Sequence, residues 1–559
     1  MKKLTLKRLF AAILAVCMIA AMFSGCNKDP GVTDATKNPG VTNGTVPTGG
    51  SEKPAEPTVF KFTVCTKPEQ GDWNDYYVVK YVEEKYNVDL QFEMISSDAW
   101  KEKYPLMFLT GELPDAITGS SIDQVTYGSQ GYLIPLEDYI SAENTPNIWK
   151  MFQENPSIKG YITELDGHIY NLAGADAQLR GLSRNIFYVN TDWTHEILGK
   201  NPETLDEFYQ YLVGVRDRDM DGDGNPNNEI PISGYYNATN NKHMIQFPIL
   251  AAYGYVSTDF QVSDDGKMFY VPVQDNYKEY LKYMNKLYTE KLLDQEFFTQ
   301  TADQFCAKDT QGLLGAYCYT ASFKNHVEEE DFKRYDTIAP LTSQYNQVKM
   351  NRAYDISVIG QLYVTEDCEN PELLMKVMDW FFSEEAFIMN VWGFAYDSHP
   401  DYPGYGYKDE MTEDGRSIAF YGPEGANDAP GDYESVDAFK YAVIAPNLKT
   451  FPLYRSFGVV YTAATEAWLE HNIVDNTAEY FKAPYPRGMK FTTEEESEIS
   501  LFETDLAAYL KEMEAKMITG ELDIDATWST FVEGLKSRGL EQCLAIYQTA
   551  YDRYVENSK

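Results

Sequence analysis

The chain has 559 residues, with 47 basic and 86 acidic side chains, and its formal net charge is −39. A charge this negative excludes a protein that binds nucleic acid or an anionic membrane surface through its overall field. Hydrophobic residues make up 43% of the sequence, which is enough for real cores and excludes disorder along the whole chain. The length predicts two or more domains, or one fold built from two large lobes.

Residues 1–26 have the pattern of an export signal. Lysine and arginine near the start precede an apolar run from Leu9 to Phe23, which is too short to span a bilayer comfortably. The Ser-Gly-Cys that follows resembles the lipobox of bacterial lipoproteins, and this resemblance implies that Cys26 is lipidated. An ordinary signal peptide with an incidental cysteine is the alternative. Residues 27–58 hold few large apolar residues and repeat Pro-Gly-Val-Thr, so we expect a disordered tether.

The globular part is expected to begin at Val59 with a strand that alternates to Thr66. Apolar residues then recur at helical spacing over 76–86, with Asp75 as a possible cap and Asn87 as the end, before alternation resumes over 88–92. This order of strand, helix and strand predicts a mixed α/β fold with parallel sheets, in which ligands lie at the carboxyl ends of strands.

Capping boxes mark further helices. Thr204 with Glu207 begins one, residues 373–382 form another, and Thr493 with Glu496 begins a C-terminal helix that Gly520 ends. Two more helices follow, so the C-terminus is predicted to be helical. Between the helix at 373–382 and the C-terminal helices, residues 396–432 are rich in Gly, Pro, Asp and Tyr. This composition is typical of either a lid over a ligand or a surface insertion.

Residues 217–231 form a candidate cation loop. Oxygen ligands at alternate positions, with glycine where the chain turns sharply, are what a loop needs to wrap Ca²⁺. Neither register of the loop satisfies the EF-hand rule in full, because the glutamate falls eleventh or thirteenth, so we predict a variant loop with a structural calcium ion. A solvated acidic turn is the alternative. The predicted metal ligands are Asp219, Asp221, Asp223, Asn225, Asn227 and Glu229.

Signatures of catalysis are missing from the sequence. It contains no His-Glu-x-x-His, no Gly-x-Ser-x-Gly and no phosphate-binding glycine loop with lysine, so we predict that the chain is not an enzyme. A carboxylate pair for glycoside hydrolysis stays open among so many acidic residues. The five cysteines after residue 26 are scattered and odd in number, which indicates no disulfide framework.

Short motifs follow one another along the chain. Residues 109–117 read Leu-Thr-Gly-Glu-Leu-Pro-Asp-Ala-Ile, which resembles a motif of the extracellular solute-binding proteins of carbohydrate ABC importers. Further motifs follow in the family's order over nearly the whole chain after the signal, and those near the C-terminus match a larger lipoprotein subgroup of Gram-positive bacteria. The further motifs, from first to last, are residues 131–140, 166–170, 188–193, 202–208, 518–520, Trp528, 539–540 and 547–551.

The resemblance implies a two-lobe, periplasmic-binding-protein-like fold with a cleft between the lobes. It further implies an oligosaccharide ligand captured by hinge closure and an ABC permease as partner, while the net charge already excludes a nucleic acid partner. We expect a monomer at the extracellular face of the membrane, held there only by its lipid anchor. The expected lobes are residues 59–182 with 351–435, and 183–350 with 436–559.

Ligand contacts are predicted from position, because sugars need flat aromatic faces and planar polar groups. A surface polysaccharide hydrolase and a calcium-stiffened adhesin remain alternative functions. The sequence does not identify the sugar, and a similar small solute stays open as the ligand. The candidate ligand-binding residues are Trp73, Asn74, Asp75, Ser120, Ser121, Tyr235, Tyr236, Asn237 and Trp392.

Overall fold

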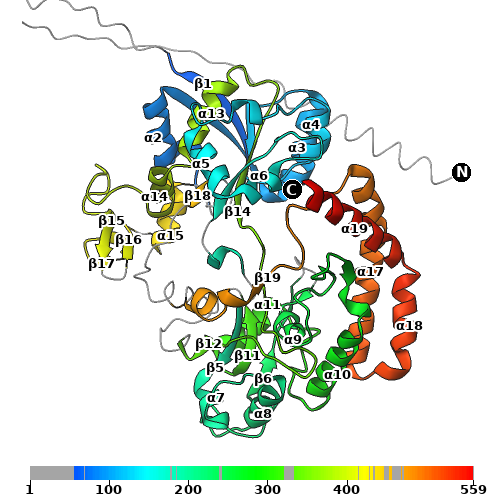
Figure 1. The fold of residues 1–559 in the computed structure, drawn as a ribbon. Coiled ribbons are helices and arrows are strands. Elements are labelled where there is room, and N and C mark those ends of the chain that lie inside the picture. The colour runs from blue at the N-terminus through cyan, green and yellow to red at the C-terminus, as the bar shows by residue number, and fades with distance from the viewer. Residues whose placement is uncertain are drawn as a thin grey trace, which may run out of the picture. The chain divides into compact units, whose positions relative to one another are not determined.

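The computed structural model describes residues 56–67, 70–176, 179–183, 186–237, 242–319, 333–412, 415–426, 428–431, 433, 435–445, 452–455, 468 and 471–557. The predicted signal peptide with Cys26, and nearly all of the predicted tether, lie outside these residues. The remaining body, from Glu56 onward, is one compact unit built around two large sheets (Figure 1).

The first sheet has six strands in the order β18-β4-β14-β3-β1-β2. They are β1 (Thr58–Thr66), β2 (Val88–Ser96), β3 (Ala116–Thr118), β4 (Leu172–Asp176), β14 (Val358–Val364) and β18 (Tyr454–Arg455). Strand β1 pairs in parallel with β2 and β3, and β18 pairs in parallel with β4. Strand β14 is antiparallel to both of its neighbours, so the predicted purely parallel sheet is in fact mixed.

The second sheet has the order β12-β5-β11-β6. Its strands are β5 (Ile186–Asn190), β6 (Ile230–Ser233), β11 (Leu314–Tyr319) and β12 (Tyr335–Thr337). Strands β6 and β11 are parallel, whereas β5 runs against β11 and β12. Strand β5 enters this sheet from the sequence of the first sheet, and β14 enters the first from the second. Neither is therefore bound by the crossover geometry that makes consecutive strands of one sheet parallel.

Helices cover both sheets. Those with residues in the first core are α2 (Tyr77–Tyr86), α5 (Pro146–Glu154), α6 (Pro156–Ile162), α13 (Pro371–Trp380) and α14 (Glu384–Trp392), while α3 (Ser97–Thr110) packs beside β2. The second sheet is accompanied by α7 (Thr191–Leu198), α8 (Leu205–Arg216), α9 (Gln246–Ala251), α10 (Asp275–Thr289) and α11 (Ala302–Thr310). The helical C-terminus comprises α17 (Thr493–Thr519), α18 (Ile524–Lys536) and α19 (Leu540–Asn557), drawn in orange to red in Figure 1.

Local signals place several of these boundaries. Asn87 ends α2 in the left-handed conformation, with φ of 52°, as predicted. The C-terminal capping box is one residue earlier than expected, because Thr492 and Glu495 make the two reciprocal bonds. Asp75 caps no helix. Instead the Asp72 side chain accepts a hydrogen bond from the Asn74 amide, at 2.9 Å, and begins a short 3₁₀ turn.

The two sheets have separate cores. The first core contains residues of β1, β4 and α13, and the second contains residues of α8, α10 and α17–α19. Val436, Phe439 and Tyr454 are buried in the first core, whereas the sequence prediction assigned everything after residue 435 to the second lobe. The chain therefore returns to the first core once more before it reaches α17. Helical patterning shows that a residue is buried but not which core buries it.

Within the segment rich in glycine and tyrosine, the strands β15 (Gly406–Thr412), β16 (Gly415–Gly422) and β17 (Gly425–Ala426) form an antiparallel sheet. Phe420 of this small sheet is buried in the first core, 5.7 Å from the ring centroid of Phe439. The five cysteines after residue 26 are all free, and four of them are buried as small apolar side chains.

Candidate functional site

The carboxyl edge of the first sheet gathers polar side chains from four strands. Strands β1, β3, β4 and β18 run in the same direction, and only β14, which lies between β3 and β4, runs in the opposite one. The carboxyl ends of these four strands therefore lie at the same edge. At a strand spacing of about 4.8 Å, the row from β18 to β1 extends over roughly 19 Å. That length suits a ligand of several linked units better than a single small molecule.

Asp176 and Arg455 stand at one end of this row, and the sequence did not single them out. They are paired residues on β4 and β18, and Arg455 Nη1 lies 3.8 Å from Asp176 Oδ2, with both side chains largely buried. A Cβ atom on Gly181 would lie 2.9 Å from the same Asp176 oxygen and 2.8 Å from the Ser357 hydroxyl, so a side chain there would displace these groups. A guanidinium fork beside a carboxylate offers donors and acceptors in one plane.

Ser120 and Ser121 follow β3 at the middle of the same edge. The Ser120 hydroxyl bonds to the Cys65 thiol at the end of β1, while burial raises the pKa of that thiol above its ordinary value. The Ser121 carbonyl accepts a hydrogen bond from the Trp100 indole at 3.4 Å. Both serines are partly exposed, so this part of the edge is open to a ligand.

The loop after β1 places its three predicted residues differently. Trp73 is fully buried in the first core, with its ring centroid 5.5 Å from that of Phe92. The Asn74 side chain joins the loop to β2, since it donates to the Phe92 carbonyl at 3.0 Å and accepts from the Phe92 amide at 2.8 Å. Asp75 is exposed. In this structure Trp73 and Asn74 hold the fold, and their contact with a ligand stays a prediction.

On the second sheet, Tyr235 and Tyr319 meet where the parallel strands β6 and β11 end. Their ring centroids are 6.3 Å apart, and each ring also packs against Phe305, at 5.4 and 5.7 Å. Burial raises the pKa of Tyr319, and the hydrogen bond from the Cys306 thiol raises it further, so the Tyr319 hydroxyl stays neutral. Tyr235 was predicted from position. Tyr319 was missed, although its place at the end of a strand was a signal.

Tyr236 and Asn237 form the short strand β7 (Tyr236–Asn237), which pairs with β8 (Lys242–His243). Lys511 Nζ of α17 lies 3.6 Å from the Tyr236 ring centroid, so Tyr236 faces away from the Tyr235 cluster. The Asn237 side chain lies outside the described residues. Trp392 is 8% exposed and packs edge-to-face on Phe387, so it belongs to a core cluster in this structure. Its predicted ligand contact also stays a prediction.

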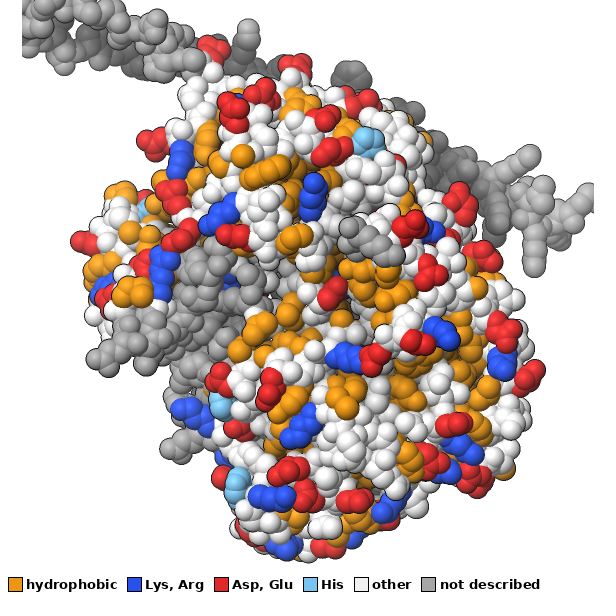
Figure 2. Space-filling view, viewed as in Figure 1, with side chains coloured by type: hydrophobic (Ala, Val, Ile, Leu, Met, Phe, Trp, Pro, Cys, Tyr) orange, Lys and Arg blue, Asp and Glu red, His pale blue; other side chains and the backbone are white. Residues whose placement is uncertain are grey.

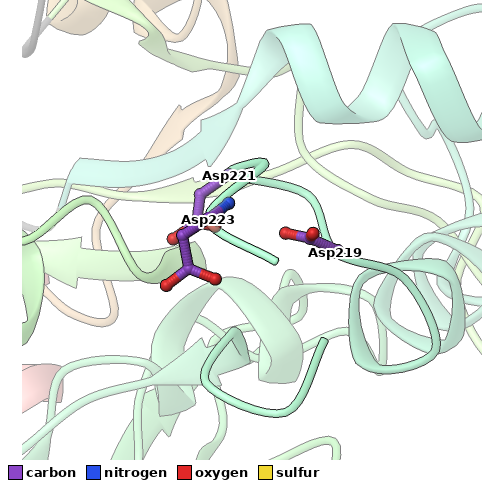
Figure 3. Close-up of side chains that lie close together, drawn as sticks. All are labelled: Asp219, Asp221 and Asp223. Atoms are coloured by element: carbon purple, nitrogen blue, oxygen red, sulfur yellow. Dashed lines mark hydrogen bonds between the residues drawn. The ribbon is translucent and has the colours of Figure 1, made fainter. Parts of the chain in front are cut away.

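The acidic loop folds back on itself. Asp219, Asp221 and Asp223 bring carboxylate oxygens within 4.8 Å of one another, and all three side chains are exposed. Figure 3 shows the Asp219 carboxylate facing the other two across the loop. Their oxygens accept bonds from the loop's own amides, and Gly222 and Gly224 have φ of 76° and 90°, which favours glycine. The loop thus turns carboxylates inward, as a cation site requires.

Glu229, the last predicted ligand, bonds back to the start of the loop. Its Oε1 accepts a hydrogen bond from the Met220 amide at 2.5 Å, and its side chain is only 8% exposed. Its other oxygen is buried and has no hydrogen-bond partner among the described residues. A buried carboxylate oxygen without a partner is costly. A bound cation would remove that cost, so the residues present fit a calcium ion.

The remaining predicted ligands stand in the same loop. The Asn225 carbonyl accepts from the Asn227 amide at 2.8 Å and retains a second lone pair. Asp217, the alternative first ligand, is instead bound to Arg216 at 2.7 Å. Of the two registers that the sequence left open, the geometry favours the one that begins at Asp219.

On the face shown in Figure 2, acidic and basic side chains are interspersed and form no large patch of one sign. Within the described part of the chain, no helix combines the length and the apolar character needed to cross a membrane.

Comparison with known proteins gives the family. Residues 67–386 match the family model of bacterial extracellular solute-binding proteins, and this span of 320 residues is more than half of the 559. The chain belongs to this family. Its function is therefore to bind a substrate, and its fold is that of the periplasmic-binding-protein-like solute-binding proteins.

Individual relatives cover nearly the whole solute-binding protein. A fructooligosaccharide ABC transporter substrate-binding protein, FusA of Streptococcus pneumoniae, is 27% identical over 517 residues, which are 90% of this chain and 91% of FusA. The structure of FusA with kestose has a TM-score of 0.67 at 25% identity and covers 89% of this chain and all of FusA. An EF-hand mutant of FusA with fructo-nystose has a TM-score of 0.66 at 25% identity and the same coverage. A human-milk-oligosaccharide-binding protein of Bifidobacterium longum infantis has a TM-score of 0.71 at 17% identity, covers 89% of this chain and 99% of its own, and supports the fold alone.

Proposed function

We propose that this chain captures an oligosaccharide outside the cell and delivers it to the permease of an ABC transporter. The observation that carries the proposal is its similarity to FusA, whose name states a fructooligosaccharide substrate, over about nine-tenths of both chains. The two sheet edges supply what such a ligand needs. The first offers the hydroxyls of Ser120 and Ser121 with the Asp176–Arg455 pair, and the second offers the tyrosine rings at the ends of β6 and β11.

The proposed mechanism involves no chemistry on the sugar. A solute-binding protein with two lobes closes by a hinge, so that groups on both lobes contact the ligand at once. Aromatic faces cover the C–H surfaces of the sugar, while carboxylate and guanidinium groups satisfy its hydroxyls. Because the ligand binds the closed form better than the open form, ligand shifts the population toward the closed form. The permease then recognises that form.

We further propose a structural calcium ion in the Asp219–Glu229 loop, with Asp219, Asp221, Asp223, Asn225, Asn227 and Glu229 as its ligands. The unpartnered Glu229 oxygen supports it, and the reported EF-hand mutant of FusA indicates such a loop in a relative. The ion would neutralise the clustered carboxylates and brace the turn between α8 and β6. Since the loop closes around its ion, it leaves little room for substrate.

The proposal also includes a lipid anchor at Cys26, a monomeric state and the absence of catalytic turnover.

The purified protein should be titrated with malto-, xylo-, manno-, galacto- and fructo-oligosaccharides of two to six units by calorimetry, with sugar analysis of the mixture afterwards. We expect saturable binding of one series and unchanged sugar. Shortened products would instead indicate a hydrolase, and a lack of binding to every series would overturn the proposed ligand class.

A further inference from the structure

A cavity of about 1080 Å³ lies among the elements of the second core, apart from the first sheet edge. Its walls come from β7, from the segments 258–260 and 298–302, and from α17, with Tyr547 of α19 at one side. Tyr236, which lines it, is the third residue after β6 and follows Tyr235 directly. Two consecutive residues thus face different places, because Tyr235 contacts Tyr319 at the end of the second sheet and Tyr236 lines the cavity.

Helix α17 leaves this space open through its choice of side chains. Leu506, Met513 and Met517 are buried in the second core and hold the helix in place. The wall of the cavity carries the small residues Ala507 and Ala508, which are exposed, in the middle of the helix. Larger side chains at these positions would fill the hollow, as they do in a packed core.

A buried hydroxyl in the wall has no hydrogen-bond partner in the part of the chain that the structure describes. This hydroxyl is Oγ1 of Thr258, which is 4% exposed. Buried polar atoms are nearly always satisfied, and leaving one unmade costs free energy. This oxygen is itself sealed from solvent, so an occupant with hydroxyl groups would complete the bond after the Thr258 side chain rotates toward the cavity.

The other polar groups of the wall are held in fixed orientations. Tyr547 donates to Glu503 Oε1 at 2.7 Å, and Gln246 donates to Glu514 Oε1 at 3.2 Å. Lys511 lies against the face of Tyr236 at 3.6 Å. Carboxylates that accept from ligand hydroxyls, together with aromatic rings, are the groups that bind neutral sugars. Two glutamates and Asp259 beside one lysine disfavour an anionic sugar.

We propose that this cavity is a saccharide subsite that receives the far units of a longer oligosaccharide and so sets the preferred chain length. This inference rests on the proposed function, because it takes the same class of ligand. Shorter members of the series would occupy only the sheet edges. Longer members would extend past Tyr236, and their hydroxyls would bind Thr258 and the glutamates.

The first test fills the cavity with Ala507→Trp in the full protein and uses the oligosaccharide series that the unmodified protein binds. We expect the longest members to bind about tenfold more weakly, which corresponds to ~1.4 kcal/mol, and the shortest to be unchanged. Ser500→Trp, on an exposed part of α17 outside the cavity wall, should change neither affinity. Equal affinities of Ala507→Trp and the unmodified protein for long members would overturn the subsite.

The second test is Thr258→Val, which keeps the shape and removes the hydroxyl. Because that hydroxyl is unpartnered, the sugar-free protein should melt at an equal or higher temperature, while long oligosaccharides should bind about two- to tenfold more weakly. Thr194→Val is the matched control, since the Thr194 hydroxyl is buried but donates to Asn201 at 2.6 Å. It should lower the melting temperature and leave affinity unchanged.

The outcomes separate the two proposals. If no series binds the unmodified protein, the proposed function fails and the subsite fails with it. If the unmodified protein binds a series, but the Thr258→Val and Ala507→Trp variants bind oligosaccharides of every length with unchanged affinity, the subsite alone is overturned. A uniform loss for all lengths in either variant would also overturn it, because a length-setting subsite spares the short ligands.

Discussion

Lys490 Nζ lies 2.8 Å from Glu164 Oε1, with 20% and 5% of their side chains exposed. Glu164 follows α6, whose Ile158 and Ile162 are in the first core, whereas Met489, next to Lys490, is in the second. The pair therefore joins the residues of one core to those of the other, in surroundings where water screens charge poorly.

Removing one partner of this pair should be costly. We predict that Lys490→Met destabilises the protein by about 3 kcal/mol, because it leaves Glu164 buried without its cation. The double variant Glu164→Gln with Lys490→Met should recover most of the loss, because no buried charge remains. Urea unfolding of the three proteins measures this. Equal losses in the single and the double variant would contradict the prediction.

The stability that His168 contributes should depend on pH. Its hydrogen bond to Glu137, at 2.5 Å, raises the pKa of His168 above 6.5. Burial pushes the pKa of Glu137 up, but the bonds from His168 and the Ile169 amide outweigh it and bring the pKa below 4.5. The histidine's contribution is therefore complete below about pH 6.5 and is lost as pH rises through its higher folded pKa.

For Glu137 the sign is opposite. Its contribution is complete above about pH 4.5 and is lost as pH falls through its lowered folded pKa. The pair should therefore stabilise most between about pH 4.5 and 6.5. Melting curves of the unmodified protein and His168→Asn should differ most in this window and converge at alkaline pH. A difference that does not vary with pH would show that the pair does not titrate as described.

Calcium should raise the melting temperature of this solute-binding protein, and a chelator should reverse the rise. At an ion concentration 100 times the dissociation constant, the expected stabilisation is about 2.7 kcal/mol. Glu229→Gln should abolish most of it, because the buried ligand oxygen is lost. Asp217→Asn is the matched control, since Asp217 is paired with Arg216 outside the ligand set, and it should respond to calcium normally. A full response in Glu229→Gln would rule out the proposed ligands.

The Asp176–Arg455 pair should matter for ligand affinity. Asp176→Asn keeps the shape of the side chain but weakens its acceptor and its pairing with Arg455, so we expect about tenfold weaker binding of the preferred oligosaccharide by calorimetry. Asp98→Asn, on the exposed first turn of α3, provides the comparison and should bind normally. Unchanged affinity in Asp176→Asn would remove this pair from the proposed site.

The proposed lipid anchor at Cys26 predicts where the protein is found. Cys26→Ser, expressed in a Gram-positive host, should move the protein from the membrane fraction to the medium, because no acyl chain can be attached. Cys306→Ser changes a partly exposed thiol of the folded body and should leave it in the membrane fraction. Membrane retention of Cys26→Ser would contradict the anchor.

Part of this protein could be predicted from short stretches of sequence. Strand β1, the end of α2 at Asn87 and the acidic loop depend on residues within a few positions of one another, so periodicity and turn chemistry indicate them. The succession of family motifs likewise led to the fold class and the substrate-binding role, which the family match confirms. The sequence also singled out Tyr235 after the acidic loop, and the structure places it two residues beyond the end of β6.

Other features depend on where the chain packs at long range. Asp176 and Arg455 are 279 positions apart and meet only because β18 pairs with β4, and Trp73 has the same local pattern whether it faces a ligand or a core. The antiparallel direction of β14 and the return of Val436, Phe439 and Tyr454 to the first core were likewise decided by tertiary packing. Burial of apolar area is non-directional, so the sequence by itself determined which segments are buried, and the packing of the whole chain decided against which partner.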